Sequence, residues 1–265
     1  MKYFNVYYYC NIISNIIESR DPDYLIVLSE FSHPYMEERP EDFIKDSVLI
    51  KFCRWASRSI MEEDMEIEFA ELANELSKID INNKKQLYKA FYNSGSYHSF
   101  EVERAIKYYF DYAPKFLDWL QESSTPAEEA FEEYLFNLWI ADKFEDVIDQ
   151  IAKEMFFILF QNRNFLLNFN YYLSCTHKYK IKRTYMPKWV KRAVFFRDRG
   201  KCVFCNNDLS GEWDVVEQNS IHYDHIIPLN YGGLNDISNI QLSCKQCNLN
   251  KSNTIDTSAS YKNWY

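Results

Sequence analysis

Four of the seven cysteines stand in two Cys-x-x-Cys pairs near the end of the chain, Cys202 with Cys205 and Cys244 with Cys247. Each pair can offer two thiolates from one tight turn, and the two pairs together would close a tetrahedral Zn²⁺ site. Four sulfur ligands leave no open coordination position. We therefore expect a structural zinc that stabilises a segment too small to have much core of its own. Four unrelated free thiols are the alternative, but two matched pairs rarely arise by accident.

The segment between and after the cysteine pairs carries a second pattern, made of polar residues and glycines. His225, Asn239 and Asn248 lie 14 and then 9 positions apart. The other members of the pattern are Asp224, Pro228, Gly232, Gly233 and Lys251. Together these residues resemble the motif of the HNH nuclease family, which has a ββα-metal fold. The resemblance covers about 65 of the 265 residues and says nothing about the first 180.

The chemistry that the resemblance implies is hydrolysis of a phosphodiester bond. This reaction needs a water deprotonated near neutral pH and a cation that neutralises the charge on the phosphate and the leaving oxygen. His225 has the intrinsic pKa of a general base. Asp224 points to the opposite face of the same strand, and in the family it ligates the metal. The amide oxygen of Asn248 is a harder ligand than imidazole, so the pair favours Mg²⁺ or Mn²⁺ over a catalytic Zn²⁺.

Three further residues have roles that the sequence leaves open. By resemblance, Asn239 would pin a loop to the strand and orient His225 for catalysis, or it is a turn-forming residue before the second strand. Lys251 would bind a substrate phosphate, or it only favours the helix C-terminus. His222 shares a strand face with Asp224 and would be a further metal ligand, or it is a partly buried strand histidine.

The main alternative function is a zinc-binding module that has lost catalysis and only holds nucleic acid or a protein partner. Such a scaffold needs the four cysteines but not the polar residues at positions 224, 225, 239 and 248. The presence of all four polar residues therefore favours an active endonuclease. Its expected substrate is DNA, taken as double-stranded.

The net charge of −9 is unusual for a protein that binds nucleic acid, since Lys and Arg drive phosphate binding. This total combines two differently charged parts. Residues 1–180 hold 19 Lys+Arg against 31 Asp+Glu, a net charge of −12, whereas residues 181–265 hold 11 Lys+Arg against 8 Asp+Glu, a net charge of +3. No apolar run approaches the roughly 20 residues of a membrane span. The start of the chain has no signal core, and paired Cys-x-x-Cys units indicate a reducing compartment. We expect a cytoplasmic protein that does not contact a membrane.

A basic segment joins these two differently charged parts. Ten basic residues lie between Lys178 and Lys201, with aromatic residues interleaved. Pro187 is suited to open a short helix that Gly200 ends. We expect this segment to lie along the DNA backbone, with substrate-binding side chains at Lys188, Lys191 and Arg192.

The first part of the chain is predicted to be mostly helical. Apolar residues recur at helical spacing from about Glu41, whereas residues 1–30 fit either a strand or a helix. The predicted fold class is α+β, with a mainly α-helical N-terminal domain followed by a small zinc-stapled ββα-metal nuclease domain. The predicted boundaries are 1–177 for the helical domain, 178–201 for the basic junction, 202–253 for the nuclease domain and 254–265 for a tail.

The acidic helical domain contains no motif that assigns it a role. One interpretation is a sensor or partner-binding region that controls the nuclease, as in bacterial restriction or anti-phage defence proteins. A second is recognition of a DNA feature, which the net charge of −12 disfavours over the surface as a whole. A third is a solvated acidic surface without an electrostatic role. The sequence assigns no oligomeric state.

Overall fold

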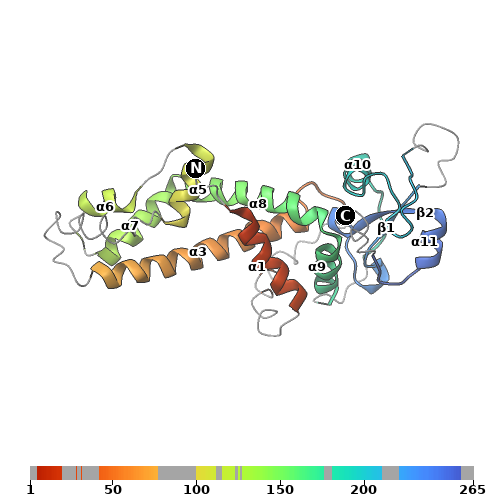
Figure 1. Cartoon of the computed structure of the whole chain (residues 1–265), viewed down its shortest axis with the longest axis horizontal. Coiled ribbons are helices and arrows are strands. Elements are labelled where there is room, and N and C mark those ends of the chain that lie inside the picture. Colours follow the sequence, from red (N-terminus) through yellow and green to blue (C-terminus); the bar gives the residue numbers. More distant parts are fainter. Residues whose placement is uncertain are drawn as a thin grey trace. The chain divides into compact units, whose positions relative to one another are not determined.

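The computed structural model describes residues 5–19, 28, 31, 42–76, 100–111, 115–122, 125, 127–175, 181–210 and 221–257 (Figure 1). A series of helices comes first in the chain, and a two-stranded antiparallel sheet followed by one helix comes last. This order confirms the predicted α+β class with a mainly helical N-terminal part. None of the described helices is long and apolar enough to cross a bilayer.

The chain forms two compact units, and neither unit is one continuous segment. Unit 1 combines Met1–Tyr9 with Arg54–Glu154, and unit 2 combines Cys10–Cys53 with Met155–Tyr265. The division falls inside three helices, namely α1 (Val6–Ser19), α3 (Val48–Leu76) and α8 (Lys143–Gln161). Unit 2 therefore joins part of the N-terminal region to all of the predicted metal-binding and catalytic residues. The domain boundaries at 177, 201 and 253 stay predictions.

A buried carboxylate joins the short helices of unit 1, which are α5 (Glu101–Phe110), α6 (Phe116–Glu122) and α7 (Ala127–Ile140). Glu103 lies on the apolar face of α5 and is only 3% exposed. It accepts hydrogen bonds from the backbone N–H of Phe116 (2.6 Å) and from the hydroxyl of Tyr134 on α7 (3.0 Å). Burial raises the pKa of Glu103 to about 7.

Unit 2 contains the sheet and the elements that pack on it. In addition to its shares of α1, α3 and α8, these are α9 (Arg163–Cys175), α10 (Lys188–Arg197), β1 (Ile221–His225), the 3₁₀ turns η2 (Leu229–Tyr231) and η3 (Ile237–Asn239), β2 (Ile240–Cys244) and α11 (Lys245–Lys251). Strand β1 pairs with β2 so that Asp224 lies opposite Gln241 and His222 lies opposite Ser243. Directly opposed residues share a face, so these four side chains lie on one face of the hairpin and His225 lies on the other.

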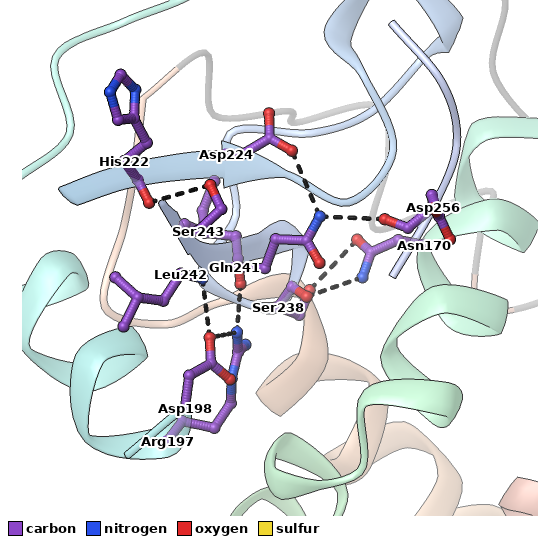
Figure 2. Close-up of polar contacts among 11 residues, drawn as sticks. Asn170, Arg197, Asp198, His222, Asp224, Ser238, Gln241, Leu242, Ser243 and Asp256 are labelled. Atoms are coloured by element: carbon purple, nitrogen blue, oxygen red, sulfur yellow. Dashed lines mark hydrogen bonds and ion pairs between the residues drawn. The ribbon is translucent and has the colours of Figure 1, made fainter. Parts of the chain in front are cut away.

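A buried ion pair at the end of α10 holds the edge of β2 (Figure 2). Arg197 donates to the carbonyl of Ile240 (2.6 Å), and Asp198 accepts from the N–H of Leu242 (2.9 Å). The two charged side chains also bond to each other and are 1% and 0% exposed. Because both charges are paired and also bonded to the backbone, this burial is tolerated.

The start of α3 differs from the sequence-based expectation. Apolar spacing predicted a helix from about Glu41, but residues 42–47 are not helical and α3 begins at Val48. Two acceptors define this start: the Ser47 hydroxyl accepts from the N–H of Ile50 (3.3 Å), and the Asp236 carboxylate accepts from the N–H of Val48 (2.8 Å). Because Asp236 is 188 positions away, local periodicity could not place this boundary.

Two other expectations about helices have clear outcomes. The ambiguous N-terminal segment is helical over Val6–Ser19. The short helix predicted after Pro187 is confirmed as α10, but it ends at Arg197 with Asp198 at the C-cap position, earlier than the predicted end at Gly200. Gly200 has a left-handed φ of 64°. The sequence also predicts a helix start with Thr125 as the N-cap and Pro126 at the first helical position, and Pro126 lies outside the described residues.

Glu103→Gln is expected to flatten the pH dependence of stability. The folded pKa of about 7 lies above the unfolded value of about 4.3, so the folded state holds an extra proton between these pH values. The free energy of unfolding therefore falls as the pH rises through this window, by roughly 3 kcal/mol in all. Glutamine is uncharged and removes this slope.

Denaturant unfolding between pH 4.5 and 8 measures the effect. The exposed Glu132 on α7 provides the control, because Glu132→Gln should keep the wild-type slope. Equal slopes in the wild type and in Glu103→Gln would contradict the assignment.

Candidate functional site

The four paired cysteines come together at one end of the hairpin. Their sulfur atoms all lie within 4.8 Å of one another, and Sγ of Cys205 is 3.8 Å from Sγ of Cys244. A tetrahedral ion with Zn–S bonds of about 2.3 Å requires sulfur separations of about 3.8 Å. The backbone N–H of Cys247 donates to Sγ of Cys244 (3.4 Å). The donor set and its spacing therefore fit a structural zinc ion.

The carboxylate of Asp224 has one oxygen engaged and one open (Figure 2). Oδ2 accepts from the ammonium of Lys251 (2.9 Å) and from the side-chain amide of Gln241 (3.3 Å). Oδ1 makes no hydrogen bond or ion pair with any residue in the described part of the chain. The carboxylate is 13% exposed, so Oδ1 is the atom available to a hard cation.

Helix α11 covers the face of the hairpin that carries Asp224 and His222. Asn248 lies on this helix, and its amide nitrogen is 3.3 Å from Nδ1 of His222. Lys251 lies one turn further and reaches Asp224. The chemistry of the Asp224 and Asn248 oxygens fits Mg²⁺ or Mn²⁺, with the His222 imidazole beside them. These three positions were predicted as metal ligands, and that assignment stays a prediction.

His225 is held by an asparagine that the sequence analysis missed. Its Nε2 is 3.2 Å from Oδ1 of Asn235, while Nδ2 of Asn235 donates to the carbonyl of Lys182 (2.8 Å). Because this second bond fixes the amide orientation, Oδ1 faces the imidazole, and Nε2 must carry the proton. The basic nitrogen is then Nδ1, which has no hydrogen-bond partner among the described residues. Burial lowers the pKa of His225 to about 4, so the ring is neutral at pH 7.

Asn239 fastens the loop between the strands, as its predicted role requires. Its Oδ1 accepts from the N–H of Ile227 (2.9 Å), and its Nδ2 donates to the carbonyls of Ile227 and Leu234 (both 3.0 Å). A Cβ atom at Gly233 would lie 1.9 Å from the Ile227 carbonyl oxygen and 2.9 Å from Nδ2 of Asn239. Only glycine therefore allows this close approach. Whether the loop orients His225 for catalysis stays a prediction.

The predicted substrate-binding cations differ in their surroundings. The Lys251 side chain is 2% exposed, and its ammonium donates to the carbonyl of His225 (2.8 Å) as well as to Asp224. Its charge is thus directed into the site. Lys188 and Arg192 are exposed one turn apart on α10. The ammonium of Lys191 lies 5.9 Å from the ring centre of Tyr223.

The family comparison agrees with this geometry. Residues 202–254 match the model of the HNH endonucleases, a range that includes both cysteine pairs, both strands and α11. The chain therefore contains an HNH endonuclease domain, which indicates a nuclease-type function with nucleic acid as the substrate. No curated protein and no solved structure matches the chain.

The residues that sequence reasoning missed depend on pairing across the hairpin or on contacts with distant elements. Gln241 meets Asp224 only in the observed register, and Asn235 meets His225 only through the fold of the loop. An alternation signal existed for Gln241, because Gln241 and Ser243 are the polar residues of the alternating strand Ile240–Cys244 and therefore share one face. No local signal marked Asn235.

Metal analysis of the purified chain is expected to find about one zinc ion per molecule, and this zinc should survive mild EDTA. Activity lost to EDTA should return with Mg²⁺ or Mn²⁺ alone. Cys247→Ser should lower the zinc content and the melting temperature, since it removes one of four ligands. Cys175→Ser changes an exposed cysteine outside the cluster and should keep zinc. Folded wild-type protein that lacks zinc would contradict the assignment.

Gly233→Ala is expected to disturb the loop held by Asn239. The added Cβ must displace the Ile227 carbonyl, at a cost of roughly 2 kcal/mol or more in the free energy of unfolding. Nuclease activity should fall as well. Gly232→Asn is the matched control, because asparagine tolerates the left-handed φ of 86° at that position. Thermal unfolding of both variants tests this, and equal melting temperatures would contradict it.

Proposed function

We propose that the chain is a metal-dependent endonuclease that hydrolyses phosphodiester bonds in DNA, taken to be double-stranded. The observation that carries this proposal is a carboxylate with one open oxygen, Asp224 Oδ1, next to His225 with its proton placed on Nε2. Within an HNH domain, these two residues supply the metal ligand and the base that the reaction needs.

The residues proposed to hold a Mg²⁺ or Mn²⁺ ion are Asp224, through Oδ1, and Asn248, through its amide oxygen. His222 is proposed as a further ligand because its Nδ1 already lies beside Asn248. When bound, the ion supplies positive charge that stabilises the negative charge developing on the phosphate and the leaving oxygen. Lys251 and Gln241 hold Oδ2 and so keep Asp224 from turning away.

His225 acts in this proposal as the general base. Its depressed pKa keeps it neutral, and Nδ1 accepts a proton from the attacking water. The imidazolium that forms is stabilised because Nε2–H donates to Asn235. Asn239 supports this step by fastening the loop that carries Asn235. The exposed cations Lys188 and Arg192, with Lys191, would bind substrate phosphates.

The proposed setting is restriction or anti-phage defence in the cytoplasm. This part rests on analogy with nucleases fused to acidic helical regions, and on the reduced state that the cysteine pairs require. The helical part of the chain would then bind a trigger or a partner protein.

A zinc-containing module that binds nucleic acid or protein without cutting is the second candidate. Two observations favour it: His225 is only 4% exposed, and Lys251 already pairs with Asp224. Incubation of the protein with supercoiled plasmid and Mg²⁺ separates the two candidates. Only an endonuclease produces nicked or linear DNA.

His225→Ala is expected to lower the cleavage rate by about 10²–10⁴-fold while zinc content and DNA affinity stay nearly unchanged. A general base acts on water in the transition state and contributes little to ground-state binding. The rate of appearance of nicked and linear plasmid measures the effect. Full cleavage by His225→Ala at ordinary Mg²⁺ would overturn the assignment of the base.

Asp224→Ala should also abolish cleavage, but for a separable reason. Loss of a carboxylate ligand weakens metal binding, so excess Mn²⁺ should restore part of the rate. No excess of metal can replace the missing base in His225→Ala. A Mn²⁺ titration of both variants on the same plasmid tests this contrast, and identical responses would argue against the separate roles.

Charge reversal of the exposed basic face should weaken binding to all DNA sequences alike. Replacing Lys188, Lys191 and Arg192 with glutamate removes cations that pair with phosphates, and phosphates carry no sequence information. The slope of log affinity against log salt should fall by about 1 for each phosphate that is no longer neutralised. Lys188→Glu alone is compared with Lys45→Glu, which makes the same single charge reversal at an exposed position outside α10. Unchanged affinity in the triple variant would show that the segment does not bind DNA.

A further inference from the structure

A fully buried aspartate stands in the loop that supports the proposed base. Asp236 is 4% exposed and lies directly after Asn235, three positions before Asn239. Its Oδ1 accepts from both the N–H (2.9 Å) and the hydroxyl (2.7 Å) of Ser238, which forms the η3 turn. Burial raises the pKa of Asp236. A carboxylate in such a place needs every hydrogen bond that it makes.

The other oxygen of Asp236 accepts a hydrogen bond from the N-terminus of a helix in a distant part of the chain. Oδ2 accepts from the N–H of Val48, the first residue of α3, at 2.8 Å. Ser47 caps the same helix locally through Ile50, so the two acceptors satisfy two N–H groups of the first turn, those of Val48 and Ile50. A negative charge at a helix N-terminus is also favoured by the helix dipole. The start of α3 and the η3 turn thus share one carboxylate.

Helix α9 holds the same turn from a second direction (Figure 2). Nδ2 of Asn170 donates to the carbonyl of Ser238 (3.1 Å) and to the carbonyl of Leu166 within its own helix (2.8 Å). The Ser238 hydroxyl also lies 3.4 Å from Oδ1 of Asn170. Asn170, Ser238 and Asp236 are all buried, so water does not substitute for these bonds at low cost.

The residues on either side of this turn are those that support His225. Asn235 accepts from its Nε2, and Asn239 bonds to Ile227 and, through its carbonyl, to the N–H of Ile226 (2.7 Å). A displacement of the turn would therefore move both supports together. Both α3 and α9 lie outside residues 202–254, which match the nuclease family.

We infer that Asp236 and Asn170 are positioning residues through which α3 and α9 hold the Asn235–Asn239 turn in the geometry that orients His225. Helix α9 and the start of α3 then contribute to the geometry of the nuclease site, although both lie outside the family segment. This inference rests on the proposed endonuclease function. Asp224 lies on the opposite face of the hairpin and Asn248 lies on α11, so metal binding is not expected to depend on this contact.

The chain offers a matched control for Asp236. Asp208 forms the same local turn, in which its carboxylate accepts from the N–H and the hydroxyl of Ser210. Asp208 is exposed and, in the described part of the chain, bonds to no helix. Asp236→Ala and Asp208→Ala therefore remove the same turn, and only the first removes a hydrogen bond to α3.

In single-turnover plasmid cleavage by the full chain, Asp236→Ala should lower the maximal rate by roughly 10–100-fold, as expected for loss of a group that orients a catalytic residue. The DNA concentration at half-maximal rate, the zinc content and the Mn²⁺ affinity measured by electron paramagnetic resonance should stay within about twofold. Asp208→Ala should leave all four quantities unchanged. A rate for Asp236→Ala equal to that of Asp208→Ala would overturn the inference.

A second variant removes the same bond from the helix side. Val48→Pro deletes the N–H, and proline is well tolerated at the first position of a helix. Val48→Ala shortens the side chain but keeps the N–H, so it is the matched control. The rate should fall in Val48→Pro and not in Val48→Ala. Combined with Asp236→Ala, Val48→Pro should cause little further loss, because both remove one interaction.

The outcomes separate this inference from the proposed function. A wild-type chain that cuts no plasmid would contradict the endonuclease proposal itself. A wild-type chain that cuts, with losses that add fully in the Asp236→Ala/Val48→Pro double variant, would contradict the inference alone. If Asp236→Ala does not fold, the comparison of Val48→Pro with Val48→Ala decides, and equal rates in those two variants would overturn the inference.

Discussion

The register of the β1–β2 hairpin constrains every other part of the site. Side chains of adjacent strand residues point to opposite faces of the hairpin. A shift of the pairing register by one residue would therefore place Asp224 on the face that now carries His225, and His225 on the face that now carries Asp224. Two strands of five residues bury too little surface to fix this register by themselves. The buried pair of Arg197 and Asp198 binds the carbonyl of Ile240 and the N–H of Leu242 on β2, and the four cysteine sulfur atoms gather at the end of the hairpin.

Charge is balanced inside the site before any ligand arrives. The Lys251 ammonium is withdrawn from solvent and shared between Asp224 and a backbone carbonyl, so the carboxylate is partly neutralised. This arrangement lowers the cost of holding an anion at low exposure. In the proposed function, attraction of substrate phosphates then falls to exposed cations such as Lys188 and Arg192. The buried Lys251 thus balances the charge of Asp224, whereas the exposed Lys188 and Arg192 remain accessible to solvent.

The sequence predicted those features that depend on short separations. The cysteine pairs, a strand that holds Asp224 and His225, and Asn239 before the second strand follow from spacing within one motif, and the structure has these features. The start of α3 could not be predicted, because its acceptor Asp236 lies 188 positions away. The interactions of Gln241 and Asn235 likewise depend on register and loop geometry. Local alternation places Gln241 on a polar strand face but does not pair it with Asp224, and no local pattern marks Asn235.

The shared carboxylate of Asp236 has a consequence for the transfer of this HNH domain into other proteins. A graft limited to the family segment, residues 202–254, would carry Asp236 and Ser238 without the N–H of Val48 or the amide of Asn170. The carboxylate would then be left without its partner on α3, and the ring packing of Phe52 on α3 against Phe169 on α9 would also be absent. A fusion designer would need to include the start of α3 and all of α9, or to redesign the turn with a solvated surface.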